Sequence, residues 1–198
     1  MPLKPALPDT ALAQLFHVAH SQGGWLDDPV PEATLRELYA LACMGPTSMN
    51  CQPMRLLFVT TPEGKARLLP AMSAGNVEKV KQAPVTAIVA YDTQFYELMP
   101  QVWPGAGTRD MFAGNAALAS ITATRNGTLG GGYLIMAARA LGLDCGPMSG
   151  FDNAKLDAEF FANGRLKSNF ICCLGVGDPA KVRARNARLG FEQACQVV

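Results

Sequence analysis

One long segment restricts the folds open to this chain more than any other. Residues from about Asp110 to Leu141 are rich in alanine and other helix-forming residues, and Gly142 follows them as a typical residue after a helix end. We therefore expect one long helix, to which the other elements must be fitted. Gly127 and the glycine run 130–132 lie inside it, where they either break the helix or let another helix approach closely.

The glycine run has a second interpretation, because glycine-rich loops also bind phosphate. This run does not follow a predicted strand, lacks a Lys-Ser/Thr pair after it and continues directly into the helical sequence YLIMAARALG. A P-loop or a Rossmann turn requires a strand before the glycines and a helix that begins there. Helix packing is therefore the better interpretation.

The remaining segments mix helical and strand-like patterns without a repeat. The strand-like runs are few and irregularly separated, which does not suit a doubly wound sheet and indicates the α+β class. With 198 residues, 49% of them hydrophobic, the chain can bury one full core, so we expect a single domain over residues 1–198. We expect helices from Asp9 or Thr10 to Gly23, from Pro31 to before Pro46 and from Thr61 to about Met72, strands at 55–60, 85–92 and about 168–176, irregular structure at 94–110, and no core helix in the C-terminal tail.

Charge and hydropathy exclude several classes of partner. The net charge is +1 and there is no basic run, so the sequence has no electrostatic footprint for nucleic acid. No apolar stretch approaches the eighteen or so residues that a membrane span requires. The N-terminal sequence MPLKPALPDTALAQLF lacks the uninterrupted apolar region of a signal peptide. We expect no membrane segment.

The cysteines and histidines argue against a metal site. Six cysteines show neither a CxxC pair nor a zinc-like spacing with histidine, and Cys172 and Cys173 sit in an apolar run. The two histidines are His17 and His20, which leaves little for a nucleophilic triad. We expect free thiols in a reduced, cytoplasmic protein.

Residues 45–53, GPTSMNCQP, form a polar loop between two hydrophobic elements. Pro46 and Pro53 fix φ and remove donors, so the preceding helix pattern must stop. Polar side chains in such a place need partners, which either solvent or a heterocycle with ring nitrogens and carbonyls would supply. A second loop, GPMSG at residues 146–150, favours a binding site. GPMSG is not the GxSxG elbow, because its serine directly precedes the second glycine.

Together these segments resemble the FMN-dependent nitroreductase family over nearly the whole chain. The matching pieces, in order, are AHSQGGW with DDPVPEATL, GPTSMNCQP, NVEK at 76–79, YLIMAARALGLD, GPMSGFD and the pair Arg188-Leu189. The segments FYELMP, TATRN and LGLDCGPMSGFD are most similar to the malonic semialdehyde reductase, or 3-hydroxypropionate dehydrogenase, branch.

The resemblance implies a three-layer fold, with a central, mainly antiparallel sheet flanked by helices, in an intertwined homodimer. Two FMN molecules would lie at the subunit interface, each touched by both chains, and the long helices would form much of that interface. No catalytic side chain is implied, because the flavin itself carries the hydride. The implied cofactor-binding residues are His20, Ser21, Gln22, Pro46, Thr47, Ser48, Asn50, Gln52, Asn76, Lys79, Pro147, Met148, Ser149, Gly150, Arg185 and Arg188.

The resemblance also assigns roles. Ser21 and Arg188 would bind the phosphate, and residues 47–52 would lie along the flavin, donated across the dimer. Asn76 and Lys79 would reach the pyrimidine edge of the ring, where the lysine charge would tune the redox potential. The loop Pro147–Gly150 would cover the other edge, with a backbone N–H near Gly150 facing N5.

The implied reaction is a ping-pong hydride transfer from NADH or NADPH, through flavin N5, to a small aldehyde such as malonic semialdehyde. The alternatives are a broad reductase of nitroaromatics, quinones or enones, and a flavin-binding redox module with little turnover. A substrate carboxylate would need a cation, for which Arg109 and Arg125 are candidates. No dinucleotide fingerprint selects between NADH and NADPH.

Three positions depart from the family pattern. Ala19, Gly23 and Asn186 stand where many or some relatives have basic residues. His20, Gln22, Arg183 and Arg185 are the candidates to compensate. Each lost charge-assisted hydrogen bond costs roughly 1.5–3 kcal/mol, so we expect FMN to bind but with reduced affinity.

Overall fold

The centre of the protein is a four-stranded antiparallel sheet with the strand order β1-β2-β4-β3. The computed structural model describes residues 4–198. The strands are β1 (Met54–Val59), β2 (Val85–Asp92), β3 (Asp144–Met148) and β4 (Leu166–Gly175). Ile88 pairs with Ile171 in the middle of the sheet, and the register shifts between Val89 and Ala90. In this order β1 and β3 form the two opposite edges.

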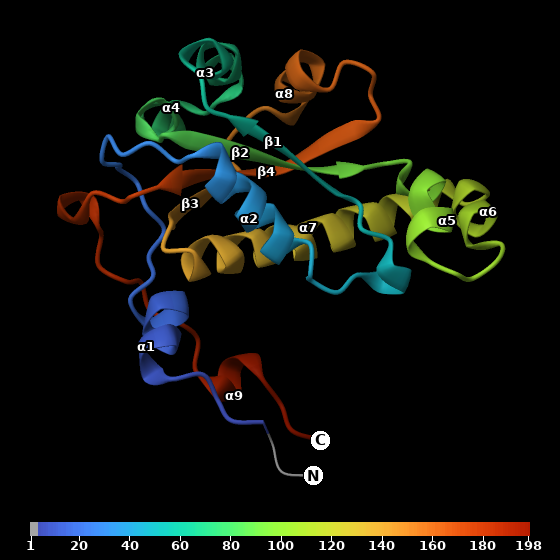
Figure 1. Cartoon of the computed structure of the whole chain (residues 1–198), viewed down its shortest axis with the longest axis horizontal. Helices are drawn as coiled ribbons and strands as arrows, with labels where there is room; N and C mark the ends of the chain where they lie inside the picture. The colour runs from blue at the N-terminus through green and yellow to red at the C-terminus, as the bar shows by residue number, and fades with distance from the viewer. Residues whose placement is uncertain (1–3) are drawn as a thin grey trace.

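Helices cover both faces of the sheet (Figure 1). On one face α7 (Ala116–Ala140) and α2 (Glu32–Ala42) pack against the side chains of Ala87, Val89 and Cys172. On the other face α3 (Pro62–Leu68), α4 (Ala74–Gln82) and α8 (Asn153–Phe160) pack against the alternate side chains, among them Ile88 and Ile171. Successive strand residues point to opposite faces, so each strand contributes to both cores. The α+β class and the three-layer arrangement are therefore confirmed.

The long helix α7 contains the glycine run without a break, and the run's neighbour is the sheet. A Cβ added at Gly131 would lie 2.5 Å from the Phe170 ring, and one at Gly127 would lie 2.8 Å from the Cβ of Tyr91. The expectation that these glycines break the helix or admit another helix is wrong at these positions, because they let strands approach closely. The predicted helix also begins too early. Asn115 caps α7 by accepting a hydrogen bond from the Leu118 N–H at 3.0 Å.

The N-terminal helix is shorter than predicted. It consists of α1 (Asp9–Leu12) and a wider π-helical turn, Ala13–His17. The chain then extends along the edge of β3, where the Gln22 N–H donates to the Cys145 carbonyl at 2.8 Å, so residues 18–23 are not helical. The prediction that the N-terminal sequence lacks the apolar region of a signal peptide concerns in part residues 1–3, which lie outside the described residues.

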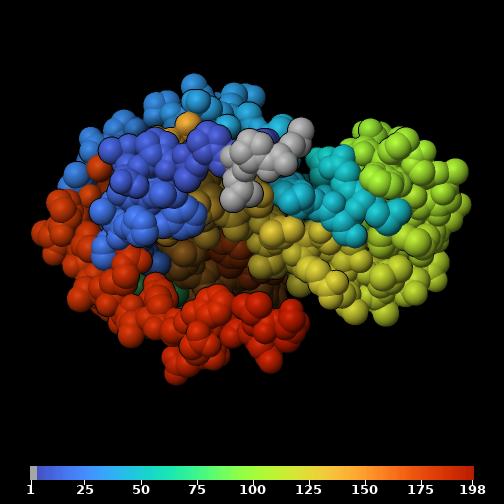
Figure 2. Space-filling model, turned by 90° about the horizontal axis from the view of Figure 1, so that it is seen from below, coloured from blue at the N-terminus to red at the C-terminus, as the bar shows by residue number. Residues whose placement is uncertain are grey.

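Several short elements were not predicted. Residues 94–113 include α5 (Met99–Val102) and α6 (Thr108–Ala113), and the tail carries α9 (Phe191–Ala194). α1 and α9 project from the body on the α7 side of the sheet (Figure 1). Seen from that side, a hollow lies between the N-terminal segment, the C-terminal tail and the α5–α6 lobe (Figure 2). Among residues 4–198, no helix combines the length and apolarity needed to cross a membrane.

Candidate functional site

Most of the predicted site residues fall into two groups at opposite edges of the sheet. We call residues 45–53, which lead into β1, the β1 loop. We call Ser21, Asn76, Lys79 and residues 147–150 the β3-edge group, since they lie beside β3, at its end or directly after it. Three inter-strand spacings separate β1 from β3, which is about 14 Å. One chain therefore does not bring the two groups together.

The β3-edge group is organised around the carbonyl of Gly150. The Asn76 side-chain amide donates to this oxygen at 3.1 Å, as does the backbone N–H of Ser73. The Lys79 ammonium in turn donates to the Asn76 side-chain oxygen at 3.2 Å. A Cβ at Gly150 would lie 2.6 Å from the Asn76 amide nitrogen, so glycine is required for this approach. An ammonium, an amide and a bare backbone segment are thus held together at this edge.

Ser21 and Gln22 border the same edge. Ser21 is exposed, and its backbone forms an isolated parallel β-bridge with Cys145 of β3. Gln22 is 8% exposed and packs against Gly177. Its side-chain oxygen is buried and has no hydrogen-bond partner among the described residues. A buried acceptor without a donor is costly, so this oxygen is a place where a ligand's donor would be favourable.

Arg185 brings the C-terminal tail to this region. Its guanidinium donates to the carbonyls of Phe16, His17 and Ala19, the last at 2.6 Å. A cation at these carbonyls is favourable because they end a helical segment. The Arg185 guanidinium therefore lies at the residue that precedes His20. Arg188 is exposed and donates to the carbonyls of its neighbours Asn186 and Ala187.

The β1 loop has an unusual backbone. Met49, Asn50 and Gln52 have φ values of 51°, 50° and 40°, which is the left-handed region. For a residue with a Cβ, the left-handed conformation costs roughly 1–2 kcal/mol. Asparagine tolerates this region better than methionine or glutamine. The loop therefore needs external restraints to keep its shape.

Those restraints are mostly hydrogen bonds. The Ser48 N–H donates to the Asn126 side-chain oxygen of α7 at 2.8 Å, and the Gln52 N–H donates to the Thr47 hydroxyl at 3.2 Å. The Asn50 amide donates to the Val102 carbonyl at 2.8 Å. The hydroxyl of Ser48, by contrast, makes no hydrogen bond within the described part of the chain and is exposed. The loop thus presents a free polar side chain on a restrained backbone.

A cleft of about 470 Å³ adjoins the β1 loop. Its lining combines polar residues of the loop with apolar residues of α2 and β1, including Thr47, Gln52, Tyr39 and Leu56. Cys51, also in the lining, is 2% exposed. Burial raises the pKa of its thiol to about 11, although a hydrogen bond with Thr47 opposes that rise. The thiol is therefore neutral near pH 7 and is not a nucleophile.

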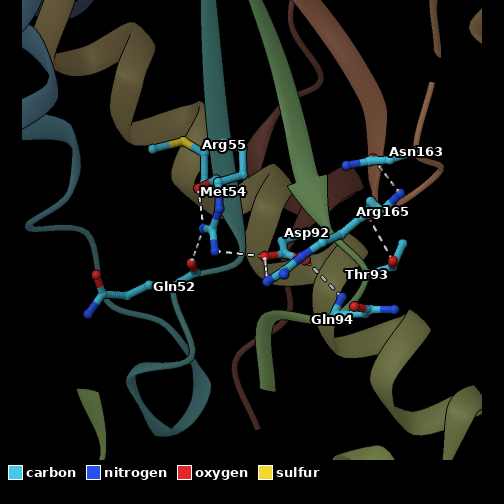
Figure 3. A network of polar contacts seen from close by, with 8 residues as sticks. All are labelled: Gln52, Met54, Arg55, Asp92, Thr93, Gln94, Asn163 and Arg165. Carbon is cyan, nitrogen blue, oxygen red and sulfur yellow. Dashed lines mark hydrogen bonds and ion pairs between the residues drawn. The ribbon is translucent and has the colours of Figure 1, made fainter. Parts of the chain in front are cut away.

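Sequence reasoning missed a buried ion-pair cluster beside the loop. Asp92, the last residue of β2, contacts Arg55 and Arg165 (Figure 3). Burial raises the pKa of the Asp92 carboxyl, but the hydrogen bond from Arg165, the N–H of Gln94 and the two nearby positive charges outweigh it and hold the pKa below its ordinary value. An acidic residue that ends an otherwise apolar strand was the available signal. Asn126, which holds Ser48, had no comparable signal in the sequence.

The two candidate partners for a substrate carboxylate differ in availability. Arg109 is bound by both carboxylate oxygens of Glu97 and by Asp110, which occupy its guanidinium. These acidic neighbours raise its pKa further. Arg125 is exposed on α7, and its side chain makes no ion pair or hydrogen bond within residues 4–198. Of the two, Arg125 is the one free to bind an anion. Within the same residues, no cluster of three metal-binding side chains occurs.

Comparisons with known proteins agree with this architecture. A protein of Cupriavidus pinatubonensis, provisionally named NADH dehydrogenase/NAD(P)H nitroreductase Reut_A1586, is 58% identical over 189 residues, covering 94% of this chain and 96% of its own. The solved structure of an enone reductase of gut-bacterial fatty acid saturation, CLA-ER, has a TM-score of 0.82 at 23% identity and covers 94% of this chain and 97% of that one.

A second solved structure, a provisionally named nitroreductase of Exiguobacterium sibiricum 255-15 in complex with FMN, has a TM-score of 0.81 at 18% identity. It covers 98% of this chain and 99% of that one. At these identities the two structures show the fold alone. The Nitroreductase family profile matches residues 24–178, which include the β1 loop and most of the β3-edge group. Together with the 58% identical relative, this match shows that the chain belongs to the nitroreductase family.

Proposed function

We propose that this protein is an FMN-dependent NAD(P)H oxidoreductase, in which each flavin site is built from the β3-edge group of one chain and the β1 loop of a second copy. The single observation that carries the proposal is the placement of two incomplete polar groups at opposite edges of one sheet. A two-fold symmetric homodimer places the same surface of each chain against the other, so it can bring one chain's loop to the other chain's edge. The family assignment supports the enzyme class and the cofactor.

The residues present suit FMN. Exposed Ser21, with His20 and the Arg185 guanidinium close by, offers the hydroxyl and positive charge that a phosphate requires. The buried oxygen of Gln22 lacks a donor, and the missing side chain at Gly150 lets the Asn76 amide approach the backbone there. Arg185 is a good candidate to replace the basic residue that relatives have at position 19, because its guanidinium lies at the Ala19 carbonyl.

The chain's own residues would bind and orient the cofactor. The bound flavin would supply the hydride chemistry, passing two electrons from NAD(P)H to the substrate in a ping-pong cycle. Lys79 would place positive charge near the ring, where reduction adds negative charge, and Asn76 holds the ammonium in position. The thiol of Cys51 is neutral near pH 7 and brings no negative charge to the cleft.

Two substrate classes remain in the proposal. The likeness to malonic semialdehyde reductases supports reduction of a small aldehyde acid to 3-hydroxypropionate, with Arg125 as the free cation for its carboxylate. The provisional name of the 58% identical relative, an NAD(P)H nitroreductase, supports the nitroaromatic substrates of a broader reductase, whose other substrates would be quinones or enones. A redox module with little turnover is the third candidate. We place the activity in a single-domain protein of the cytoplasm, without nucleic acid or membrane partners.

The test is anaerobic reduction followed by a substrate panel. Purified protein loaded with FMN should lose its visible flavin absorption on addition of NADH or NADPH. The reduced protein should then be reoxidised by malonic semialdehyde, a nitroaromatic, a quinone or an enone. Faster reoxidation by the aldehyde, and its loss in Arg125→Ala, would select the first class. Protein that does not bind FMN at all would refute the proposed function.

A further inference from the structure

The ends of three strands meet at one buried carboxylate. Asp92 ends β2 and is 1% exposed. Arg165, just before β4, donates to both of its oxygens at 2.8 Å. Arg55, in β1, donates to one of them at 2.9 Å. Figure 3 shows both guanidinium groups next to the carboxylate.

The two arginines differ in what else they hold. Arg55 also donates to the carbonyl of Gln52 at 2.9 Å and to that of Met54 at 2.9 Å. The guanidinium of Arg165 has Asp92 as its partner among the described residues. Asp92 therefore fixes Arg55, and Arg55 fixes a carbonyl of the β1 loop. Arg165 is fixed by the same carboxylate without touching the loop.

This contact acts at a strained position. Gln52, whose carbonyl Arg55 holds, has a φ of 40°, and the next residue, Pro53, accepts a hydrogen bond from the Asp92 N–H at 2.9 Å. Strained backbone persists where the surrounding structure restrains it. Asn126 and Val102 restrain the front of the loop, while Arg55 and Asp92 restrain the end that enters the sheet.

We propose that Arg55 is a positioning residue of the flavin site. Held by Asp92, it fixes the Gln52 carbonyl and keeps the β1 loop in the left-handed shape that presents Thr47, Ser48 and Asn50 to the cofactor. The inference rests on the proposed function, because the loop's ligand is the FMN of that site. Without Arg55 the loop must be ordered when FMN binds, and the entropy lost in ordering it weakens the affinity.

The test compares Arg55→Met with Arg165→Met in the full-length protein. Each variant removes one guanidinium from Asp92, so both are expected to lower the unfolding temperature. Only Arg55→Met releases the loop. Titration of the apoprotein with FMN, followed by flavin fluorescence, should show a dissociation constant raised about tenfold or more in Arg55→Met, the size expected for one charge-assisted hydrogen bond. Arg165→Met should stay within about twofold of wild type.

Two further measurements keep the outcome clear. Arg55→Lys keeps a charge beside Asp92 and a donor for one carbonyl, so it should recover part of the lost affinity even if Arg55→Met folds poorly. Hydrogen exchange of the apoproteins should be faster at the Ser48 and Gln52 amides in Arg55→Met than in Arg165→Met. Equal dissociation constants in the two methionine variants, or equal exchange, would overturn the role of Arg55. Failure of the wild type to bind FMN would refute the proposed function, and the exchange comparison would still decide whether Arg55 restrains the loop.

Discussion

Lys79 lies at the end of a short hydrogen-bond chain that begins at the Gly150 carbonyl and passes through Asn76. We expect Lys79→Gln to lower the two-electron midpoint potential of the bound flavin, because an ammonium stabilises the negative charge gained on reduction. For charges about 4 Å apart at an effective dielectric constant near 20, the loss is at most of order 90 mV. Spectroelectrochemical titration measures it.

The matched control for that prediction is Lys81→Gln. Lys81 lies two residues further along α4 and pairs with Glu78 on the exposed side of the helix. Its replacement should leave the potential unchanged. Equal shifts in the two variants would mean that net charge, and not the position of Lys79, sets the potential.

Asp92 makes stability depend on pH. Its pKa is held below the ordinary value in the folded protein, so its contribution is present above the unfolded-state pKa of about 4 and is lost as the pH falls through the folded-state pKa. Asp92→Asn should lower the unfolding free energy by about 1.5–3 kcal/mol at pH 7, because it removes the charge that Arg55 and Arg165 bind, while both arginines keep some contact with solvent. Urea unfolding at several pH values should show this difference shrink as the pH falls below about 4.

Asp110→Asn serves as the control for the pH series, since the Asp110 side chain is 80% exposed. Its stability should follow that of the wild type at every pH. A difference between wild type and Asp92→Asn that stays constant down to the lowest pH would contradict the assignment.

Polarity alone marks only the predicted site residues of the β1 loop, and the others were implied by the family resemblance. Thr47, Ser48 and Asn50 stand out because they are polar between apolar elements. Asn126 looks like any polar residue in a long helix, yet it holds the Ser48 N–H. Its role depends on the packing of α7 against the β1 loop, which distant parts of the chain determine.

At the scale of elements, α7 can lie close to the sheet because small residues face it. Gly131→Ala places a methyl group 2.5 Å from the Phe170 ring, so we expect a loss of about 1–3 kcal/mol in unfolding free energy. Gly75→Ala, in α4, meets nothing within 4 Å. It should be neutral or stabilising by up to about 1 kcal/mol. Chemical denaturation of the two variants provides the comparison, and equal stabilities would contradict the close approach of α7.

The elements predicted from the sequence are those with strong local patterns. The apolar runs at 55–60, 85–92 and 168–176 correspond to β1, β2 and β4 within two residues. β3 was taken for a loop because it contains Gly146 and Pro147, which an edge strand tolerates since one side needs no ladder hydrogen bonds. α4 was missed because it buries little apolar surface, with Val80 its one fully buried residue.

At the scale of the whole molecule, the α7 side of the protein carries apolar residues that one chain leaves exposed. Leu118, Ile121, Leu129 and Tyr133 are exposed along α7. The hollow in Figure 2, between the two terminal segments and the α5–α6 lobe, lies on this side. Apolar side chains that are exposed along one helix are a feature of surfaces that bind another subunit. A single sequence does not reveal which faces of its helices a second copy covers, so the assembly remained a prediction of the family resemblance.

Mixed dimers test the central claim, that each flavin site is shared between two chains. Ser48→Tyr blocks the β1 loop, and Gly150→Val blocks the β3-edge group, so neither homodimer should bind FMN well. A mixed dimer has one Ser48→Tyr chain and one Gly150→Val chain. Both substitutions then fall in one flavin site, and the other site is built from two unaltered surfaces. FMN titration of purified, differentially tagged mixed dimers should therefore show half the wild-type stoichiometry with wild-type affinity. Mixed dimers that bind no FMN would show that each site is built within one chain, contrary to this account.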